Sequence, residues 1–250
     1  MTKDRQTFEM PHQLTYYEES ANGRPTLRSL LALGILVSEH QSTAMGVGEE
    51  VTGPRHLGWV VTEYSGHISS RSPKNGEQVV LGCKAVAYNR LLAEREFWVR
   101  SQGGEEYARF RGLFVMFDIK ARKMVSIPHD LVAPYRMPTQ LRLPKIKRPA
   151  RFQESTDTRT RQYRVRFFDI DLNRHVNNAV YSDWMMDPLG ADFLMSHRLT
   201  DFAIRYEHEV RYGQEIESRF NSVSDSTTLH QIRIGQTTAA TAQFDWATFR

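Results

Sequence analysis

The chain has very little cysteine and no long apolar run, and each absence excludes a class of protein. Its 250 residues include one cysteine, Cys83, which can form neither an internal disulfide nor a cysteine-based metal cluster. The longest apolar stretch, Leu30–Val37, runs into charged and polar residues and is too short to span a bilayer. The charged N-terminus is not followed by an apolar segment, so it does not read as a secretory signal. We therefore expect a cytoplasmic protein without a membrane span.

Several catalytic motifs are also missing. The sequence has no Gly-x-Ser-x-Gly, no His-Glu-x-x-His and no paired cysteines, which argues against a serine hydrolase, a zincin and a zinc finger. Gly46-Val47-Gly48 begins like a dinucleotide-binding loop, but Val51 stands where the third glycine is needed. We expect no metal site.

The composition is that of a folded protein with a mild excess of positive charge. Hydrophobic residues make up 40% and charged residues 25%, close to the globular average. The net charge of +4 favours an acidic partner such as nucleic acid, a phosphorylated cofactor or an acidic carrier protein.

A segment rich in proline and basic residues divides the chain. Five prolines lie between Pro128 and Pro149, and proline interrupts both helices and strands. We predict an N-terminal unit at 1–128, a linker at 129–160 and a C-terminal unit at 161–250. The linker lacks the interleaved aromatic residues that bind single-stranded nucleic acid, so a solvated linker and a docking surface for an acidic carrier remain open. The basic residues concerned are Arg142, Lys145, Lys147, Arg148 and Arg151.

The two halves repeat one order of predicted elements. In the first half, a strand at Leu14–Tyr17 precedes a turn and a long apolar helix from about Pro25 to Val37. In the second, a strand at Tyr163–Phe168 precedes a helix that begins near Val176 and ends near Pro188. Further strands are predicted at 59–64, 78–88, 95–99 and 109–117, then at 202–210, 215–223, 228–235 and 239–249.

A strand, a long helix and an antiparallel meander, present twice, predict an α+β fold of two tandem hot-dog repeats. In each repeat a curled sheet would wrap around the helix. Two unrelated α+β domains are the alternative.

One polar run stands at a predicted strand-to-helix junction, where free backbone N–H groups and the helix dipole can stabilise negative charge. It spans 171–181 and reads Asp-Leu-Asn-Arg-His-Val-Asn-Asn-Ala-Val-Tyr. Any single Asn or Asp here would be explained as a helix cap. The whole run is harder to explain in that way.

The pattern Asp-x-Asn-x-His-Val-Asn-Asn resembles the acyl-ACP thioesterases, the plant plastid enzymes and their bacterial relatives. The resemblance implies catalytic roles for Asp171, Asn173 and His175, and it places a catalytic carboxylate at Glu209 on the following strand. Val210 stands where many plant members have a cysteine, so a cysteine nucleophile is not expected. The first half lacks Asn-x-His before its helix, which implies a catalytically degenerate repeat that binds the acyl chain.

The implied reaction is hydrolysis of fatty acyl groups carried on acyl carrier protein, without metal or cofactor. We expect Glu209 and His175 to orient and deprotonate a water molecule, Asn173 to position the water or the carbonyl, and Asp171 to fix the junction. The backbone N–H groups of Val176 and Asn177 would hold the oxyanion.

Three alternatives remain open. Strand alternation places Glu207 on the same face as Glu209, so Glu207 is a rival for the base. The second alternative is coenzyme A as the carrier in place of acyl carrier protein, and the third is a protein that binds acyl groups without hydrolysing them. The intact Asp171, Asn173, His175 and Glu209 argue against a binding protein. The expected partners are acyl carrier protein and a fatty acyl substrate, not nucleic acid. Whether the chain forms a homodimer is left open by the sequence.

Overall fold

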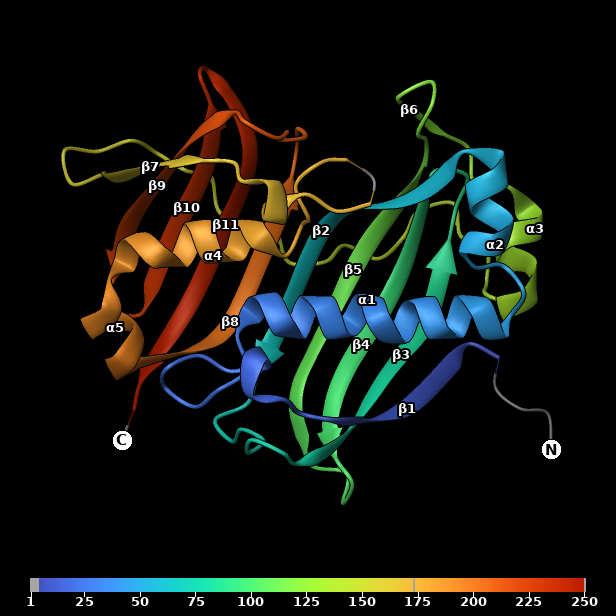
Figure 1. The fold of residues 1–250 in the computed structure, drawn as a ribbon, viewed down its shortest axis with the longest axis horizontal. Helices are drawn as coiled ribbons and strands as arrows, with labels where there is room; N and C mark the ends of the chain where they lie inside the picture. Colours follow the sequence, from blue (N-terminus) through green and yellow to red (C-terminus); the bar gives the residue numbers. More distant parts are fainter. Residues whose placement is uncertain (1–4, 173, 250) are drawn as a thin grey trace.

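A continuous antiparallel sheet of 11 strands runs through the chain, and the helices α1 and α4 cover one of its faces (Figure 1). The computed structural model describes residues 5–172 and 174–249. The strands are β1 (Thr7–Gln13), β2 (Leu57–Ile68), β3 (Gln78–Tyr88), β4 (Leu92–Ser101), β5 (Glu106–Asp118), β6 (Lys123–Val125), β7 (Arg159–Arg164), β8 (His197–Tyr206), β9 (Glu215–Ser224), β10 (Thr227–Ile234) and β11 (Thr237–Thr248). The α-helices are α1 (Leu27–Ala44), α2 (Glu49–Thr52), α3 (His129–Val132), α4 (Val180–Met186) and α5 (Ala191–Ser196). Short 3-10 turns are η1 (Tyr16–Glu18), η2 (Gly53–Arg55), η3 (Ala133–Tyr135), η4 (Phe167–Asp169) and η5 (Asp187–Leu189).

The strand order shows how the two halves correspond. The sheet runs β1-β3-β4-β5-β2-β8-β11-β10-β9-β7, and β6 pairs with β5. Followed from its own outer edge inward, each half places its first, third, fourth, fifth and second strand side by side. The halves join where β2 pairs with β8, from Glu63 opposite Arg205 to His67 opposite Asp201.

Helix α1 forms because an apolar stripe follows a good capping residue. The Thr26 hydroxyl oxygen accepts a hydrogen bond from the Ser29 N–H at 3.0 Å, which satisfies one of the free donors of the first turn. Leu30, Leu31 and Val37 are buried against the sheet, in a core cluster that also includes residues of the second half. The two halves of the sheet have the same strand order, and each has a helix on the same face, which confirms the predicted α+β fold with two hot-dog units.

The predicted first strand of each half is misplaced. The first strand is β1, which ends at Gln13. The residues predicted as a strand, 14–17, instead lead into η1 and form its first two positions. Pro11 obscures β1 in the sequence, but an edge strand tolerates proline because one side of it has no partner. In the second half β7 ends at Arg164, and the rest of the predicted strand forms η4.

The second-half helix is shorter than predicted. It begins at Val180, because the Asn177 side-chain oxygen accepts a hydrogen bond from the Ala179 N–H at 2.9 Å and holds the preceding residues out of the helix. The predicted end near Pro188 and Gly190 is confirmed, since Pro188 lies in η5 and Gly190 has a φ of 88°.

The segment between the halves crosses the sheet on the face opposite α1. Arg148 pairs with Glu63 at 2.6 Å, and Glu63 precedes Tyr64, whose side chain is buried in the core on the other face. The residue before Arg148, Lys147, pairs with Asp245 of β11 at 2.8 Å. Among the residues that the structure describes, no helix is long and apolar enough to cross a bilayer.

Candidate active site

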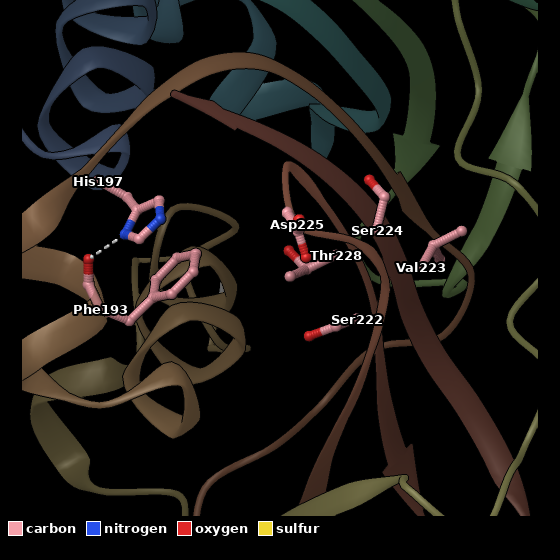
Figure 2. A pocket seen from close by; sticks show the side chains of 7 residues that line it. All are labelled: Phe193, His197, Ser222, Val223, Ser224, Asp225 and Thr228. Atoms are coloured by element: carbon pink, nitrogen blue, oxygen red, sulfur yellow. Dashed lines mark hydrogen bonds between the residues drawn. The ribbon is translucent and has the colours of Figure 1, made fainter. Parts of the chain in front are cut away.

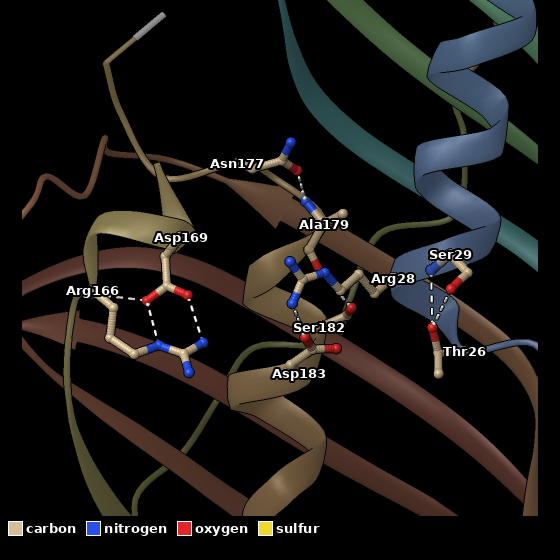
Figure 3. A network of polar contacts seen from close by, with 9 residues as sticks. All are labelled: Thr26, Arg28, Ser29, Arg166, Asp169, Asn177, Ala179, Ser182 and Asp183. Atoms are coloured by element: carbon tan, nitrogen blue, oxygen red, sulfur yellow. Dashed lines mark hydrogen bonds and ion pairs between the residues drawn. The ribbon is translucent and has the colours of Figure 1, made fainter. Parts of the chain in front are cut away.

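The predicted junction is built on a buried carboxylate, Asp169, at the end of η4. Its side chain is 1% exposed and accepts hydrogen bonds from the Arg166 N–H at 2.8 Å and from Arg166 Nη2 at 2.7 Å (Figure 3). Its backbone carbonyl accepts the Asn177 N–H at 2.9 Å. Burial by itself raises the pKa of Asp169, but the hydrogen bonds from Arg166 outweigh it and hold the pKa below its ordinary value. These hydrogen bonds hold the start of the junction in place.

The turn that follows brings Asp171 and His175 together. The Asp171 N–H donates to the His175 carbonyl at 3.0 Å, and His175 Nδ1 lies 3.7 Å from Asp171 Oδ1. Both side chains are about one-fifth exposed, at 23% and 21%. Arg174, at the tip, has a φ of 65°, a left-handed conformation that is uncommon for a residue with a side chain. Asn173 lies outside the described residues.

Glu209 lies beside this turn. The Val176 N–H donates to the Val210 carbonyl at 2.9 Å, which holds the segment after β8 against the junction. The Glu209 carboxylate forms an ion pair with Arg122 and lies 3.6 Å from Arg211. The structure therefore places Asp171, His175 and Glu209 in one region.

The predicted strand at 202–210 is wrong beyond Tyr206, where β8 ends. The N–H groups of Glu207 and His208 both donate to the Ala239 carbonyl, at 2.8 and 3.1 Å. Two residues opposite one acceptor form a bulge-like irregularity that ends the regular alternation of side chains. The argument that placed Glu207 and Glu209 on one strand face therefore does not apply.

The predicted oxyanion donors are occupied. The Val176 N–H donates to the Val210 carbonyl and the Asn177 N–H to the Asp169 carbonyl, both at 2.9 Å. These residues precede the helix and pair with backbone, so their N–H groups are not the free donors of a helix start. The prediction that they hold an oxyanion is contradicted by this geometry.

Three tyrosines that were not predicted from the sequence lie next to the junction, Tyr64 and Tyr181 buried and Tyr206 half-buried. The Tyr206 hydroxyl donates to the Asn178 carbonyl at 3.0 Å, and the Asn178 side-chain amide donates to the Tyr64 hydroxyl at 3.4 Å. Burial raises the pKa of the Tyr181 hydroxyl, the nearby Glu209 and Asp171 carboxylates raise it further, and a hydrogen bond with the Val210 backbone opposes them. Asn178 and Tyr181 belong to the polar run at 171–181, and this was the signal in the sequence for the tyrosine group.

Arg122 was also missed, and the sequence contains no signal for it. It lies in the polar turn between β5 and β6 of the first half and reaches Glu209, which is 87 residues away. Local patterns do not report a contact at this separation. The candidate site is therefore built from both halves.

The five basic linker residues lie elsewhere, on the linker that crosses the sheet face opposite α1. All five have exposed side chains, and two of them, Arg148 and Lys147, form the ion pairs with Glu63 and Asp245. Their role in carrier binding stays a prediction.

Two hollows in the described part of the chain contain none of the predicted catalytic residues. One, of about 520 Å³, is open to solvent between α5 and the β9–β10 turn (Figure 2). It is lined by Phe193, His197, Ser222, Val223, Ser224, Asp225 and Thr228. The other, of about 20 Å³, lies beneath the start of α1 beside Leu30, Val99 and Tyr107, with room for about one water molecule. The described residues include no group of His, Cys, Asp and Glu arranged to hold a metal ion.

Comparison with known proteins gives matches over both halves. Residues 5–135 match the family model of the acyl-ACP thioesterase N-terminal domain, and residues 152–248 match that of the C-terminal domain. The chloroplastic dodecanoyl-[acyl-carrier-protein] hydrolase of Cinnamomum camphora is 29% identical over 171 residues, which are 66% of this chain and 44% of that protein. The match thus spans less than half of that relative's length.

Two solved structures share the fold over nearly the whole chain. A Lactobacillus plantarum protein, provisionally called an oleoyl thioesterase, is 39% identical with a TM-score of 0.92, over 98% of this chain and 97% of its own. The 12:0-ACP thioesterase of Umbellularia californica is 21% identical with a TM-score of 0.85, over 97% and 98%, a likeness that bears on the fold alone.

Proposed function

The chain belongs to the acyl-ACP thioesterase family, and from that premise we propose that it hydrolyses the thioester of fatty acyl groups carried on acyl carrier protein. The observation that supports this most directly is that the segment with Glu209 lies against the turn with Asp171 and His175. Glu209 is distant from the other two in the sequence, and the 2.9 Å hydrogen bond between the Val176 N–H and the Val210 carbonyl holds it near them. Two acid–base groups can act on one water molecule only if both lie near it.

In the proposed reaction, Glu209 and His175 orient a water molecule and accept its proton as it attacks the thioester carbonyl carbon. The C–S bond then breaks, the carrier thiolate leaves and takes up a proton, and a free fatty acid remains. Thioester hydrolysis of this kind requires a positioned water, a base and an oxyanion donor. Asp171 would hold His175 in place, since their side chains lie 3.7 Å apart.

The oxyanion donor has to come from a group other than the two occupied N–H groups. We assign the role of positioning the carbonyl to the Asn173 side-chain amide, which is a hydrogen-bond donor. Arg122 and Arg211 would orient Glu209, with which both interact.

We assign binding of the acyl chain to the first half, residues 1–128, and catalysis to the second, residues 161–250. Leu30, Ile68 and Val99 form an apolar part of the lining of the small cavity beneath α1, which suits an alkyl chain, and Arg24, Arg71 and Ser72 form a polar part. At about 20 Å³ the cavity is far too small for such a chain, so side chains around it would have to move when substrate binds. Residence in the cytoplasm and assembly as a homodimer remain predictions.

Single-turnover hydrolysis of an acyl carrier protein substrate tests the assignment. Glu209→Gln and His175→Ala should each lower the rate by about 10²–10⁴-fold. The double variant should lose much less than the product of the two single losses, because groups that act on one water behave as a unit.

Glu207→Gln is the matched control, since Glu207 is an exposed carboxylate two positions away. It should stay near the wild-type rate. A collapse of Glu207→Gln together with a normal Glu209→Gln would move the base to Glu207, and unchanged rates in both would remove the carboxylate from the mechanism.

Two other functions are separated by the choice of substrate. A preference for acyl-CoA over the same acyl group on carrier protein would make the protein a coenzyme A thioesterase. Tight binding of acyl substrates without turnover would make it a binding protein.

A further inference from the structure

Four large apolar side chains are exposed around the candidate site. Phe167, Phe168, Leu172 and Tyr212 are 70%, 86%, 101% and 64% exposed. The rings of Phe167 and Tyr212 lie 6.4 Å apart and those of Phe167 and Phe168 lie 5.6 Å apart. Exposed apolar groups that gather in one place mark an interaction surface more often than scattered ones do.

The apolar residues come from the same two segments as the candidate catalytic residues. Phe167 and Phe168 lie in η4, Leu172 follows Asp171, and Tyr212 follows Glu209 closely in the chain. The segments are tied together by the Val165 N–H, which donates to the Gln214 carbonyl at 2.9 Å. Anything that contacts this surface is therefore next to the site.

Arginines surround the apolar residues. The Arg166, Arg211 and Arg122 side chains are 69%, 59% and 49% exposed, and Arg174 is exposed at the tip of the site turn. Within the described residues, no carboxylate forms an ion pair with Arg174. Asp169 pairs with Arg166, and Glu209 pairs with Arg122 and Arg211, so Arg174 is the arginine of this group that is left to pair with an acidic partner.

The first half contains an equivalent aromatic pair that has no arginine next to it in the chain. Tyr16 and Tyr17 in η1 are 72% and 88% exposed, with ring centroids 5.0 Å apart. They are followed by Glu18 and Glu19, whereas Phe167 and Phe168 lie between Arg166 and Asp169, which form an ion pair with each other. An adjacent arginine thus distinguishes the phenylalanine pair from the tyrosine pair.

We propose that the surface formed by Phe167, Phe168, Leu172, Tyr212 and the adjacent arginines, hereafter the aromatic–arginine surface, docks the acidic carrier protein. This inference rests on the proposed function, because the carrier has to bring its thioester to Asp171 and His175. Aromatic residues would supply contact area at the centre, and the arginines would steer an acidic partner toward the site. The basic linker, on the face opposite α1, would not be the main contact.

The test compares acyl carrier protein with acyl-pantetheine, which has the same thioester without the protein. We expect Phe167→Ala/Phe168→Ala to lower kcat/KM for acyl carrier protein by roughly tenfold or more and to change kcat/KM for acyl-pantetheine much less. Tyr16→Ala/Tyr17→Ala is the matched control and should leave both values near wild type. Equal losses on both substrates, no loss on either, or the same loss in the tyrosine variant would overturn the proposal.

Charge is tested with Arg174→Asn, because asparagine tolerates the left-handed backbone at this position. The variant should lower the ratio of carrier to pantetheine activity at low salt and weaken its salt dependence. Lys145→Glu/Arg151→Glu probes the linker and leaves the Arg148–Glu63 pair intact. If only the linker variant loses carrier activity, the docking site is the linker and the proposal is wrong.

Direct binding separates this proposal from the proposed function. If the wild type hydrolyses neither substrate, the proposed function fails, and the affinity for acyl carrier protein then decides the docking surface. Weaker binding by Phe167→Ala/Phe168→Ala than by the tyrosine control would support docking, and equal binding would overturn it.

Discussion

Cys83 shows how burial controls the chemistry of a single side chain. It is fully buried at 0% exposure, and its Sγ lies 3.3 Å from the Gln41 side-chain oxygen. Burial raises the pKa of the thiol to about 11, although the nearby Arg95 guanidinium acts in the opposite direction. At neutral pH the side chain is therefore a thiol and not the reactive thiolate.

We expect Cys83→Ala to keep turnover within about twofold of wild type, because an inert buried thiol takes no part in the attack on the thioester. Iodoacetamide should label Cys83 in urea and leave it unmodified in the native protein. Complete loss of activity in a folded Cys83→Ala variant would contradict a mechanism in which water is the nucleophile.

At the scale of elements, the η4 turn depends on the Asp169 carboxylate. Asp169→Asn removes the charge that the Arg166 N–H and guanidinium contact, and we expect it to lower the free energy of unfolding at pH 7 by about 1–3 kcal/mol. Because the folded-state pKa of Asp169 is held below its ordinary value, its contribution is present above the unfolded pKa of about 3.9 and is lost as the pH falls through the folded pKa.

Urea unfolding at pH 7 and at successively lower pH measures this effect. The difference in stability between wild type and Asp169→Asn should be largest above about pH 4 and should shrink below it. Asp157→Asn, at an exposed position, serves as control and should match wild type. A difference that does not change with pH would show that Asp169 acts through packing and not through its charge.

For the whole molecule, the continuity of the sheet and the core makes the two halves interdependent. Strands β2 and β8 pair across the boundary, one hydrophobic cluster includes residues of both halves, and Arg28 of α1 forms an ion pair with Asp183 of α4 at 2.8 Å (Figure 3). Separating the halves would expose the edges of β2 and β8 together with apolar surface.

We therefore expect the protein to unfold in a single transition. Hydrogen exchange followed by mass spectrometry across a urea series should give the same midpoint for β3 of the first half and β10 of the second. Two separate midpoints would show that each half is stable without its partner.

Features that depend on local pattern could be predicted before the fold was known. The apolar stripe of α1, the bounds of β3 at Gln78–Tyr88 and the repeated order of elements could all be predicted, because periodicity and turn residues act over short distances. The polar run at 171–181 indicated the family, because all the residues of the motif lie within one short segment of the chain.

Which backbone groups are free and which distant side chains come into contact depends on the packing of the whole chain. The N–H groups of Val176 and Asn177 are bonded to carbonyls of other segments, and β8 ends at Tyr206 because two N–H groups share the Ala239 carbonyl. Arg122 reaches Glu209 from the other half. Such hydrogen bonds and ion pairs depend on how distant segments pack, and hydrophobic periodicity contains no information about them.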